Sequence, residues 1–350
     1  APCGRSRPTG TSEGVGVHAL VTGGAGFIGS TLVYRLLAEG HTVDVIDNLS
    51  SGSLANLADA RAGSQHDLKF HQIGIRAPEV VELIERRSPE VVFHLAAQAD
   101  VRVSVADPVL DAQINLIGAL NVLEGARRAG PAKVVFASSG GTIYGEPDPS
   151  ALPVTEAAPH RPLSPYGVSK NAFTDYLVAY RELHEVEFTS LALANVYGPR
   201  QDPHGEAGVV SIFAGRLLAR AARTVLGTGM QTRDFVYVDD VVDAFYRAAT
   251  RGGGLLFNIG TGREGSVIEL YDAMAAAAGV TTPAVFAPAR VGELDRIALD
   301  ASKARLHLGW EPWTDLAAGT SAVIEWTRAS GRGPLRPAGP ASPGAAPWGP

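Results

Sequence analysis

The chain has 350 residues, of which 45% are hydrophobic and 19% are charged, and its formal net charge at pH 7 is −6. That length suffices for one large domain, or for a large domain and a small one. The negative charge argues against nucleic acid and anionic membrane surfaces as general partners. The single cysteine, Cys3, excludes an intrachain disulfide and a cysteine-based zinc site, and it fits a reducing compartment such as the cytoplasm.

Both ends of the chain have the composition of tails. Residues 1–16 are rich in Gly, Ser, Thr, Pro and Arg and lack an apolar run, and residues 331–350 are mostly Gly, Pro, Ala and Ser. We therefore expect both segments to be disordered. No apolar stretch approaches the length of a membrane span, so we expect no membrane partner. The nine histidines form no ligand pair such as H-E-x-x-H, so we expect no metal.

A glycine-rich turn follows the strand predicted over residues 17–21 and precedes a predicted helix. Gly24, Gly26 and Gly29 satisfy G-x-G-x-x-G, and Gly23 begins the wider pattern G-x-x-G-x-x-G. Between a strand and a helix, this pattern predicts a dinucleotide site. Glycine lets a pyrophosphate approach the backbone, and the free N–H groups at the start of the helix then face the phosphates.

A second strand, predicted over residues 42–46, ends at Asp47. The Asp47 carboxylate is placed to accept hydrogen bonds from an adenosine ribose, and it would repel a 2′-phosphate. The sequence therefore predicts NAD rather than NADP.

Strands and helices alternate along the first part of the chain. Further strands are predicted over residues 68–73, 90–97, 133–137 and 188–194, and helices over residues 30–39, 80–87, 111–128 and 166–184. This alternation predicts an α/β fold with a Rossmann-type, doubly wound parallel sheet and right-handed crossovers.

The regular alternation of strands and helices ends near residue 197, where a long polar loop leads into a mixture of shorter strands, helices and loops. We assign residues 17–196 to an NAD-binding Rossmann domain, with returns to the sheet from residues 236–262. Residues 197–330 form mainly a smaller C-terminal α/β lobe that binds substrate. The cleft between the two parts is the expected substrate site.

Tyr166 and Lys170 stand four residues apart at the start of a predicted helix, so they share one face. Ser164 is the expected N-cap, followed by a first-turn proline. An ammonium group beside a phenol favours the phenolate, which can then move a hydroxyl proton while hydride leaves the same carbon. A serine or threonine from the preceding strand end would complete the site.

These features together resemble the extended short-chain dehydrogenase/reductase family, and within it the branch of bacterial UDP-hexose 4-epimerases. The resemblance extends from about residue 17 to about residue 326. It rests on residues 22–29, 47–48, 94–98, 138–145, 166–170, 195–200 and 232–240.

The resemblance implies reversible C4 epimerisation of a UDP-hexose (UDP-glucose or UDP-galactose) through a transient 4-keto sugar, with NAD bound throughout. It assigns the proton transfer to Tyr166, the nicotinamide ribose to Lys170, and the catalytic hydroxyl to Ser139. This loop is one residue longer than in many relatives, so Ser138 and Thr142 remain alternatives for that hydroxyl.

The same resemblance implies two sets of binding residues. The cofactor set is Gly23, Gly26, Phe27, Ile28, Gly29, Asp47, Asn48, Ser51, Gly52, Gly74, Ile75, Leu95, Ala96, Ala97, Gln98, Asn115, Tyr166 and Lys170. The substrate set is Ser139, Thr142, Tyr166, Asn195, Gly208, Val209, Val225, Leu226, Arg233, Arg290 and Arg296.

Two positions carry further expectations. Asn115 lies among apolar residues of a predicted helix, so it is either a satisfied buried polar group or a residue that positions the active-site backbone. Gly74 stands where relatives carry an aspartate that bonds the adenine amino group. The loss of that bond, on the order of 0.5–1.5 kcal/mol, predicts weaker or more exchangeable NAD.

Several alternatives stay open. A UDP-glucuronate or UDP-N-acetylhexosamine 4-epimerase would use the same fold, and so would a decarboxylase of UDP-glucuronate. A nucleotide-sugar 4,6-dehydratase fits less well, because Thr142 and Ile143 replace its Asp-Glu pair. A non-catalytic NAD-sensing protein is the hypothesis from a different class. We expect a homodimer, with the helices that contain Asp111 and Tyr166 at the interface.

Overall fold

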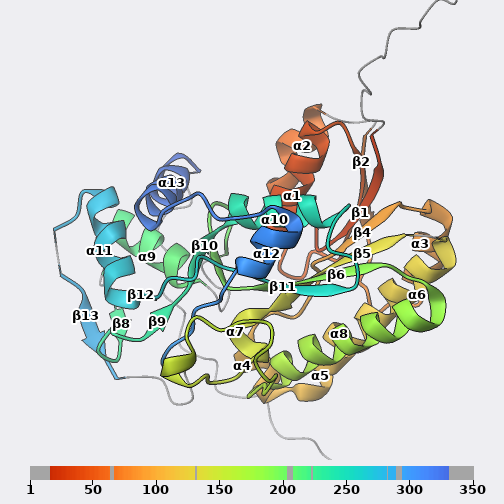
Figure 1. Ribbon diagram of the computed structural model, residues 1–350. Helices are drawn as coiled ribbons and strands as arrows, with labels where there is room; N and C mark the ends of the chain where they lie inside the picture. Colours follow the sequence, from red (N-terminus) through yellow and green to blue (C-terminus); the bar gives the residue numbers. More distant parts are fainter. Residues whose placement is uncertain are drawn as a thin grey trace, which may run out of the picture.

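The computed structural model describes residues 16–63, 67–130, 132–202, 208–221, 224–281, 283–288 and 294–330. The predicted tails lie outside these ranges, apart from Gly16. A seven-stranded parallel sheet with the order β11-β6-β5-β4-β1-β2-β3 forms the centre of the chain (Figure 1). Its strands are β1 (His18–Thr22), β2 (Thr42–Asp47), β3 (Leu68–Gln72), β4 (Val91–His94), β5 (Lys133–Ser139), β6 (Phe188–Leu193) and β11 (Leu255–Ile259).

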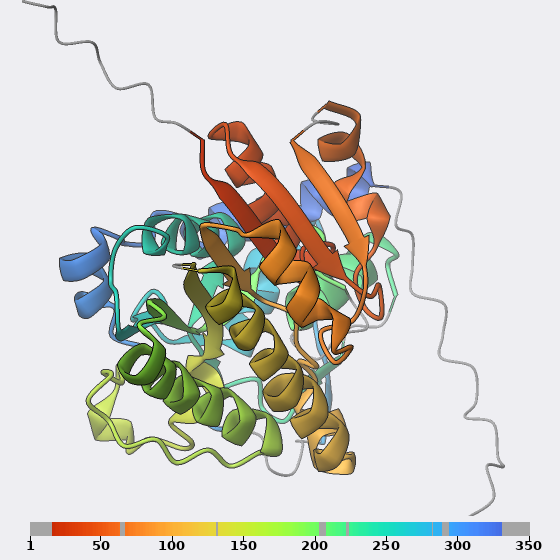
Figure 2. The ribbon, with the colours of Figure 1, turned by 90° about the vertical axis from the view of Figure 1, so that its right-hand side faces the viewer.

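Helices cover both faces of this sheet. On one face lie α1 (Phe27–Ala38) and α10 (Val238–Ala248), which pack against each other. On the other face lie α3 (Glu79–Arg87), α6 (Ala119–Ala129) and α8 (Pro165–His184), which stand in front of the sheet in Figure 2. Because successive side chains on a strand point to opposite faces, the strands β1, β2, β4, β5 and β6 supply both apolar cores. The predicted doubly wound α/β fold is confirmed.

The later part of the chain forms a second group of elements beside the sheet, on the left of Figure 1. Helices α9, α11 and α13 pack on one another there, next to three two-stranded pairings. The pairings are β7 (Asn195–Tyr197) with β10 (Phe235–Tyr237), β9 (Thr232–Arg233) with β12 (Gly265–Ser266), and β8 (Thr224–Leu226) with β13 (Val285–Ala287). The helices of this group are α9 (Val209–Leu218), α11 (Val267–Ala278) and α13 (Leu316–Ala329), whereas α12 (Ser302–Leu308) lies against α10 and β11.

Short helical elements connect the strands at the carboxyl edge of the sheet and beyond it. They are η1 (Leu54–Leu57), α2 (Ala58–Gly63), α4 (Val101–Ala106), α5 (Pro108–Ala112), η2 (Gln113–Gly118), α7 (Gly140–Ile143) and η3 (Pro149–Ala151). None of the helices in the described ranges is long and apolar enough to cross a membrane.

Two differences between the predicted elements and the structure bear on the site. Strand β4 ends at His94 rather than at residue 97, because the next residues leave the sheet to form the edge where ligands bind. The helix predicted over residues 111–128 is built as α5, a π-helical turn η2, and α6. The division of the chain between residues 196 and 197 stays a prediction.

Candidate active site

The turn after β1 is closed by positions that leave no room for a side chain. Gly23 has a φ of +71° and donates its N–H to the carbonyl oxygen of Ile46 at 2.8 Å. A Cβ atom on Gly29 would lie 2.1 Å from the carbonyl oxygen of Gly23, so α1 approaches the turn more closely than any other residue type would permit. A Cβ on Gly26, by contrast, would meet only the Gly23 oxygen, at 3.2 Å.

The start of α1 fits a pyrophosphate. Gly26 is its N-cap and supplies no side-chain hydrogen bond to the first turn. The N–H groups at the start of a helix have no partner within the helix, and they carry its positive dipole end. The missing side chain at Gly26 and these N–H donors are the features that a dinucleotide phosphate requires.

Asp47 closes β2 directly beside this turn. One carboxylate oxygen accepts a hydrogen bond from the Ala25 N–H at 2.9 Å, and the other accepts one from the Leu49 N–H at 2.8 Å. Gly52 packs on the backbone of Ala25, while Asn48 and Ser51 are exposed. Because each carboxylate oxygen can accept a second hydrogen bond, both remain able to bind a ribose. The preference for NAD that we assign to Asp47 stays a prediction.

The segment after β3 lies next to the same loop. A Cβ on Gly74 would be in ordinary contact with the side chain of Asn48, at 3.4 Å, so a larger residue has space there. Ile75 is buried, and a Cβ on Gly118 of η2 would meet its side chain at 2.8 Å. The predicted pair Gly74 and Ile75 therefore sits between the end of β2 and η2.

The loop after β4 is fixed by Thr22, at the end of β1. The Thr22 hydroxyl accepts hydrogen bonds from the N–H groups of Leu95 and Ala96, both at 3.2 Å, and shares a third with His94 Nδ1 at 2.7 Å. Complete burial, and to a smaller extent the nearby Lys170 charge, lower the pKa of His94 to about 3. His94 is therefore a neutral structural residue at physiological pH.

Asn115, in η2, holds the far end of that loop. Its side-chain oxygen accepts from the Gln98 N–H at 2.8 Å, and its amide group donates to the Gln98 carbonyl at 2.8 Å and to Asp111 Oδ1 at 2.8 Å. Asn115 therefore combines the two roles that the sequence offered as alternatives. The residue is satisfied, and it positions the backbone of the predicted cofactor loop, which includes Ala97.

Helix α8 begins as the sequence predicts, with the Ser164 hydroxyl accepting from the Gly167 N–H at 3.2 Å. Lys170 lies on the same helix face as Tyr166, with its Nζ 5.7 Å from the centre of the Tyr166 ring. Lys170 is buried and donates to the carbonyl oxygen of Ala137 at 2.9 Å. Desolvation lowers the pKa of Lys170 to about 8, and the Asp111 charge opposes that shift. The ammonium form still predominates at neutral pH.

Three candidate hydroxyls surround the start of α8. The Ser138 hydroxyl is buried and has no hydrogen-bond partner among the described residues. Ser139 ends β5 and is half-buried, and Thr142, also half-buried, is close enough to donate to the Ser139 carbonyl at 3.4 Å. A Cβ on Gly167 would lie 2.9 Å from the carbonyl oxygen of Thr142, so this turn touches the helix that bears Tyr166. Ser139 and Thr142 therefore have the better access to a ligand.

The predicted substrate residues of the second group lie on three separate elements. Asn195 is half-buried in β7, and a Cβ on Gly141 would lie 3.9 Å from its side-chain oxygen, next to the candidate hydroxyls. Gly208 and Val209 begin α9. The predicted uracil-binding pair, Val225 and Leu226, lies in β8 beside β13.

The predicted arginines differ in their surroundings. Arg233 donates to the carbonyl oxygens of Thr232, at 2.8 Å, and Asp295, at 3.4 Å. Arg296 is held in a two-point ion pair by Glu264, at 2.8 and 2.5 Å. Arg290 lies outside the described residues. A substrate role stays a prediction for all three arginines.

One buried carboxylate went unrecognised in the sequence because all its partners are distant in the chain. Asp234, between β9 and β10, accepts from the N–H and hydroxyl of Thr261, at 2.8 and 2.6 Å. It also accepts from the N–H groups of Gly262 and Leu299, both at 3.1 Å. This single side chain thus fixes the backbone beside the end of β11. The motif around Arg233 was the available signal.

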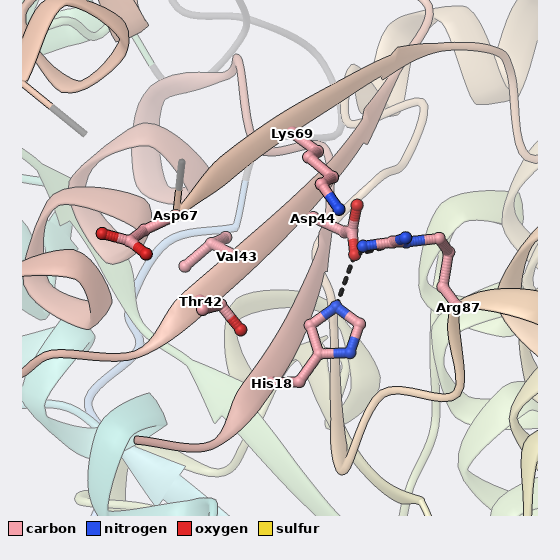
Figure 3. A pocket seen from close by; sticks show the side chains of 7 residues that line it. All are labelled: His18, Thr42, Val43, Asp44, Asp67, Lys69 and Arg87. Carbon is pink, nitrogen blue, oxygen red and sulfur yellow. Dashed lines mark hydrogen bonds and ion pairs between the residues drawn. The ribbon is translucent and has the colours of Figure 1, made fainter. Parts of the chain in front are cut away.

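A pocket of about 230 Å³ lies at the opposite edge of the sheet, where β1 and β2 begin (Figure 3). Its central group is the buried carboxylate of Asp44, which bonds the His18 ring, His71 Nε2 at 2.7 Å and Arg87 Nε at 2.8 Å. Burial alone would raise the pKa of Asp44, but these three donors outweigh it and hold that pKa below its usual value. The pocket contains none of the predicted site residues.

Comparisons with known proteins show the family to which the chain belongs. The sequence profile described as "NAD dependent epimerase/dehydratase family" matches residues 19–260. A UDP-glucose 4-epimerase from Mycolicibacterium smegmatis is 49% identical over 313 residues, which cover 89% of this chain and 99% of that protein.

Two solved structures share the fold over almost their whole length. The Thermotoga maritima UDP-glucose 4-epimerase with UDP-glucose has a TM-score of 0.85 and is 42% identical, covering 89% of this chain and 99% of that one. The Thermus thermophilus UDP-glucose 4-epimerase with NAD has a TM-score of 0.83, the same identity and the same coverage. With the family profile covering most of the chain and these relatives matching almost their whole length, the chain belongs to the NAD-dependent epimerase/dehydratase family.

Proposed function

We propose that the chain catalyses the reversible C4 epimerisation of a UDP-hexose, interconverting UDP-glucose and UDP-galactose, with NAD as its cofactor. The observation that carries this proposal is the single face shared by Tyr166 and the buried Lys170, next to the hydroxyls at the end of β5. The relatives that match this chain over most of both lengths include UDP-glucose 4-epimerases. The chain is therefore an NAD-dependent isomerase.

The residues divide the reaction between them. Tyr166 takes the proton of the sugar 4-hydroxyl, and the Lys170 ammonium favours the phenolate needed for that step. Ser139, with Thr142 as the alternative, bonds the same oxygen. NAD, which the glycine turn and Asp47 would hold, would supply the hydride chemistry at C4, so that the sugar could be oxidised there and reduced again on its other face. The buried surroundings of Lys170 strengthen its electrostatic effect on the phenolate.

The second group of elements supplies the nucleotide site. Asn195 and Arg233 are the proposed diphosphate partners, the backbone at Gly208 and Val209 contacts substrate, and β8 grips the uracil. Arg296 is already paired with Glu264 on both of its donor nitrogens. A uronate carboxylate would have to displace that glutamate, which supports a neutral hexose over UDP-glucuronate. A UDP-N-acetylhexosamine remains the closest alternative.

The catalytic pair argues against the other classes. A non-catalytic NAD-sensing protein has no need of a tyrosine and a buried lysine on one face, and both are present. The dehydratase chemistry requires an acid–base pair where this chain has Thr142 and Ile143.

We further propose a homodimer formed by α5, η2 and α8. Apolar side chains on these elements are exposed, which is costly unless a partner covers them. They are Val109 (64%), Ile117 (53%), Val168 (52%), Val178 (47%) and Leu183 (73%). Light scattering coupled to size-exclusion chromatography tests this, because a single-chain mass of 36.5 kDa would contradict the dimer. A cytoplasmic location stays a prediction from the single cysteine.

The decisive experiment incubates the purified protein separately with UDP-galactose, UDP-N-acetylgalactosamine and UDP-glucuronate, without added reductant, and separates the products by chromatography. We expect UDP-galactose to yield UDP-glucose. Conversion of UDP-glucuronate alone would move the assignment to uronate chemistry. No conversion of any of the three, even with added NAD, would contradict the proposed activity.

A further inference from the structure

Asp111, in α5, is a wholly buried carboxylate that no step of the reaction uses directly. Its exposed fraction is 0%. Oδ2 accepts from the Ser169 hydroxyl at 2.7 Å, and Oδ1 accepts from the Asn115 amide at 2.8 Å and from Gln98 Nε2 at 3.4 Å. These donors are all neutral. A buried carboxylate is unfavourable unless hydrogen bonds and a nearby opposite charge compensate for the lost water.

The nearby opposite charge is Lys170, the residue that follows Ser169 on α8. Lys170 is also buried, and its Nζ donates to the Ala137 carbonyl and faces the rings of Phe136 and Tyr166, at 4.8 and 5.7 Å from their centres. No ion pair joins Lys170 to a carboxylate within the described part of the chain. The two buried charges therefore act on each other without direct contact. Ser169, the residue before Lys170, bonds the Asp111 carboxylate.

We propose that Asp111 is a positioning residue of the active site: a buried counter-charge for Lys170 that also ties the catalytic helix α8 to the cofactor loop after β4. The structural link runs from Ser169 through Asp111 and Asn115 to the backbone of Gln98. Helices α5 and α8 lie side by side along the lower edge of Figure 1. The catalytic meaning of this link rests on the proposed function, but the charge coupling does not.

The other charged groups nearby do not replace Asp111. On β4, His94 is neutral at physiological pH, as its pKa of about 3 requires. On α8, Tyr166 is the group that the lysine charge serves. Beyond Gln98, Asp100 is paired with Arg102 at 2.7 Å, near the surface. Asp111 is thus the carboxylate that opposes the desolvation of Lys170.

The arrangement has a physical reason. A direct ion pair would hold the lysine Nζ on the carboxylate, whereas the neutral donors around Asp111 satisfy its oxygens and leave Nζ on a backbone carbonyl. The ammonium then keeps two further N–H groups for a ligand and for Tyr166. The carboxylate meanwhile favours the charged form of the lysine.

The test is a double-mutant cycle in the full-length protein with bound NAD, using Lys170→Met, Asp111→Asn and the double variant, with unfolding in urea at pH 7. Each single change leaves one buried charge without its counterpart, and the double change removes both. We expect the double variant to be about tenfold more stable, as an unfolding equilibrium constant, than the sum of the single effects predicts. Additive effects would overturn the proposal. If Asp111→Asn alone does not fold, a double variant no more stable than Lys170→Met would also overturn it.

A second readout separates a charge effect from a structural one. In Asp111→Asn, the alkaline limb of the kcat profile should move to lower pH by about one unit, because Lys170 loses its proton more easily. Asp240→Asn is the matched control. It changes another fully buried aspartate, which bonds the Thr314 hydroxyl at 2.8 Å and lies on α10. The control should lose stability additively with Lys170→Met and keep the wild-type pH profile.

An Asp111→Asn profile that superimposes on that of the wild type would contradict the charge role. The unfolding cycle uses no substrate, so it gives a result whichever sugar nucleotide the enzyme accepts. A failure of the proposed function would appear as absent turnover in the wild type with the coupling intact. A failure of this inference would appear as additive stabilities with turnover intact.

Discussion

Asp44 and Asp111 are both buried carboxylates, but the groups that surround them differ in charge. Asp44, near the amino edge of the sheet, is bonded directly by the Arg87 guanidinium and by two histidine rings. Asp111, near the carboxyl edge, is bonded by a hydroxyl and two amides, with its cation one residue beyond the hydroxyl.

This difference reflects what each edge does. At the amino edge, direct contact compensates the charge of the carboxylate and fixes the arginine, so we expect the cluster to contribute to folding stability. At the carboxyl edge, the cation is kept off the carboxylate and remains available to a ligand. Substitutions at the two edges should therefore separate into losses of stability and losses of activity.

The largest expected effect is at the carboxyl edge. Tyr166→Phe removes the proton acceptor and should reduce kcat by on the order of 10²–10⁴-fold, while the protein keeps its bound NAD and its unfolding midpoint. Steady-state kinetics with UDP-galactose measures kcat, and the absorbance of released NAD measures the bound cofactor. Tyr176→Phe, an exposed position on the same helix, is the control. Unchanged turnover in Tyr166→Phe would remove Tyr166 from the mechanism.

Asp44→Asn tests the amino edge. It leaves Arg87 without its carboxylate and should lower the free energy of unfolding by about 2–4 kcal/mol, with kcat/KM of the folded protein unchanged. Urea denaturation measures the loss, and Asp59→Asn, on the exposed side of α2, provides the control. If Asp44→Asn lost turnover but kept its stability, the amino edge would have a role in activity, and the proposed difference between the two edges would be wrong.

The pH dependence of the free energy of unfolding below pH 5 tests the amino edge in a second way. The pKa of Asp44 is lowered in the folded protein, so its contribution is fully present above the unfolded-state value of about 4 and is lost as pH falls through the folded value. Unfolding curves between pH 5 and pH 2 should therefore fall less steeply in Asp44→Asn than in the wild type. Parallel curves would show that the cluster does not depend on the Asp44 charge.

The smallest expected effect is a change in NAD affinity when an acidic side chain is added at position 74, near the carboxyl ends of the strands. Gly74→Asp places an acceptor beside Asn48, where a Cβ meets only ordinary contacts, and introduces the aspartate that the family resemblance predicts as a partner for the adenine amino group. The dissociation constant for NAD should fall by roughly 2–10-fold, equivalent to about 0.5–1.5 kcal/mol. Calorimetric titration of NAD-stripped protein measures it, with Gly63→Asp as the control. Unchanged affinity would remove Gly74 from the adenine site.

Local features of the sequence predicted the fold and the centre of the site. The glycine turn, the Ser164 cap and the pair Tyr166 and Lys170 each depend on residues within a few positions, and the structure contains all of them. The partners of Asp111 and Asp234 were not predictable, because they lie up to 58 and 65 residues away. Periodicity shows that such a residue is on a helix or strand, but not which distant group meets it.

The π-helical turn η2 makes this region sensitive to the length of the chain. It carries one more residue per turn than the helices α5 and α6 on either side, and Asn115 lies inside it. Deleting a single residue from Gln113–Gly118 would let the segment close into a continuous α-helix, and because the π-helical turn holds one residue more than an α-helical turn, the helix that follows would keep its orientation on the sheet. The apolar side of α6 would still face the sheet, and the change would fall on the widened turn itself, which places Asn115 between Asp111 and the Gln98 backbone. The count of residues in this one turn is therefore as much a part of the site as their identity.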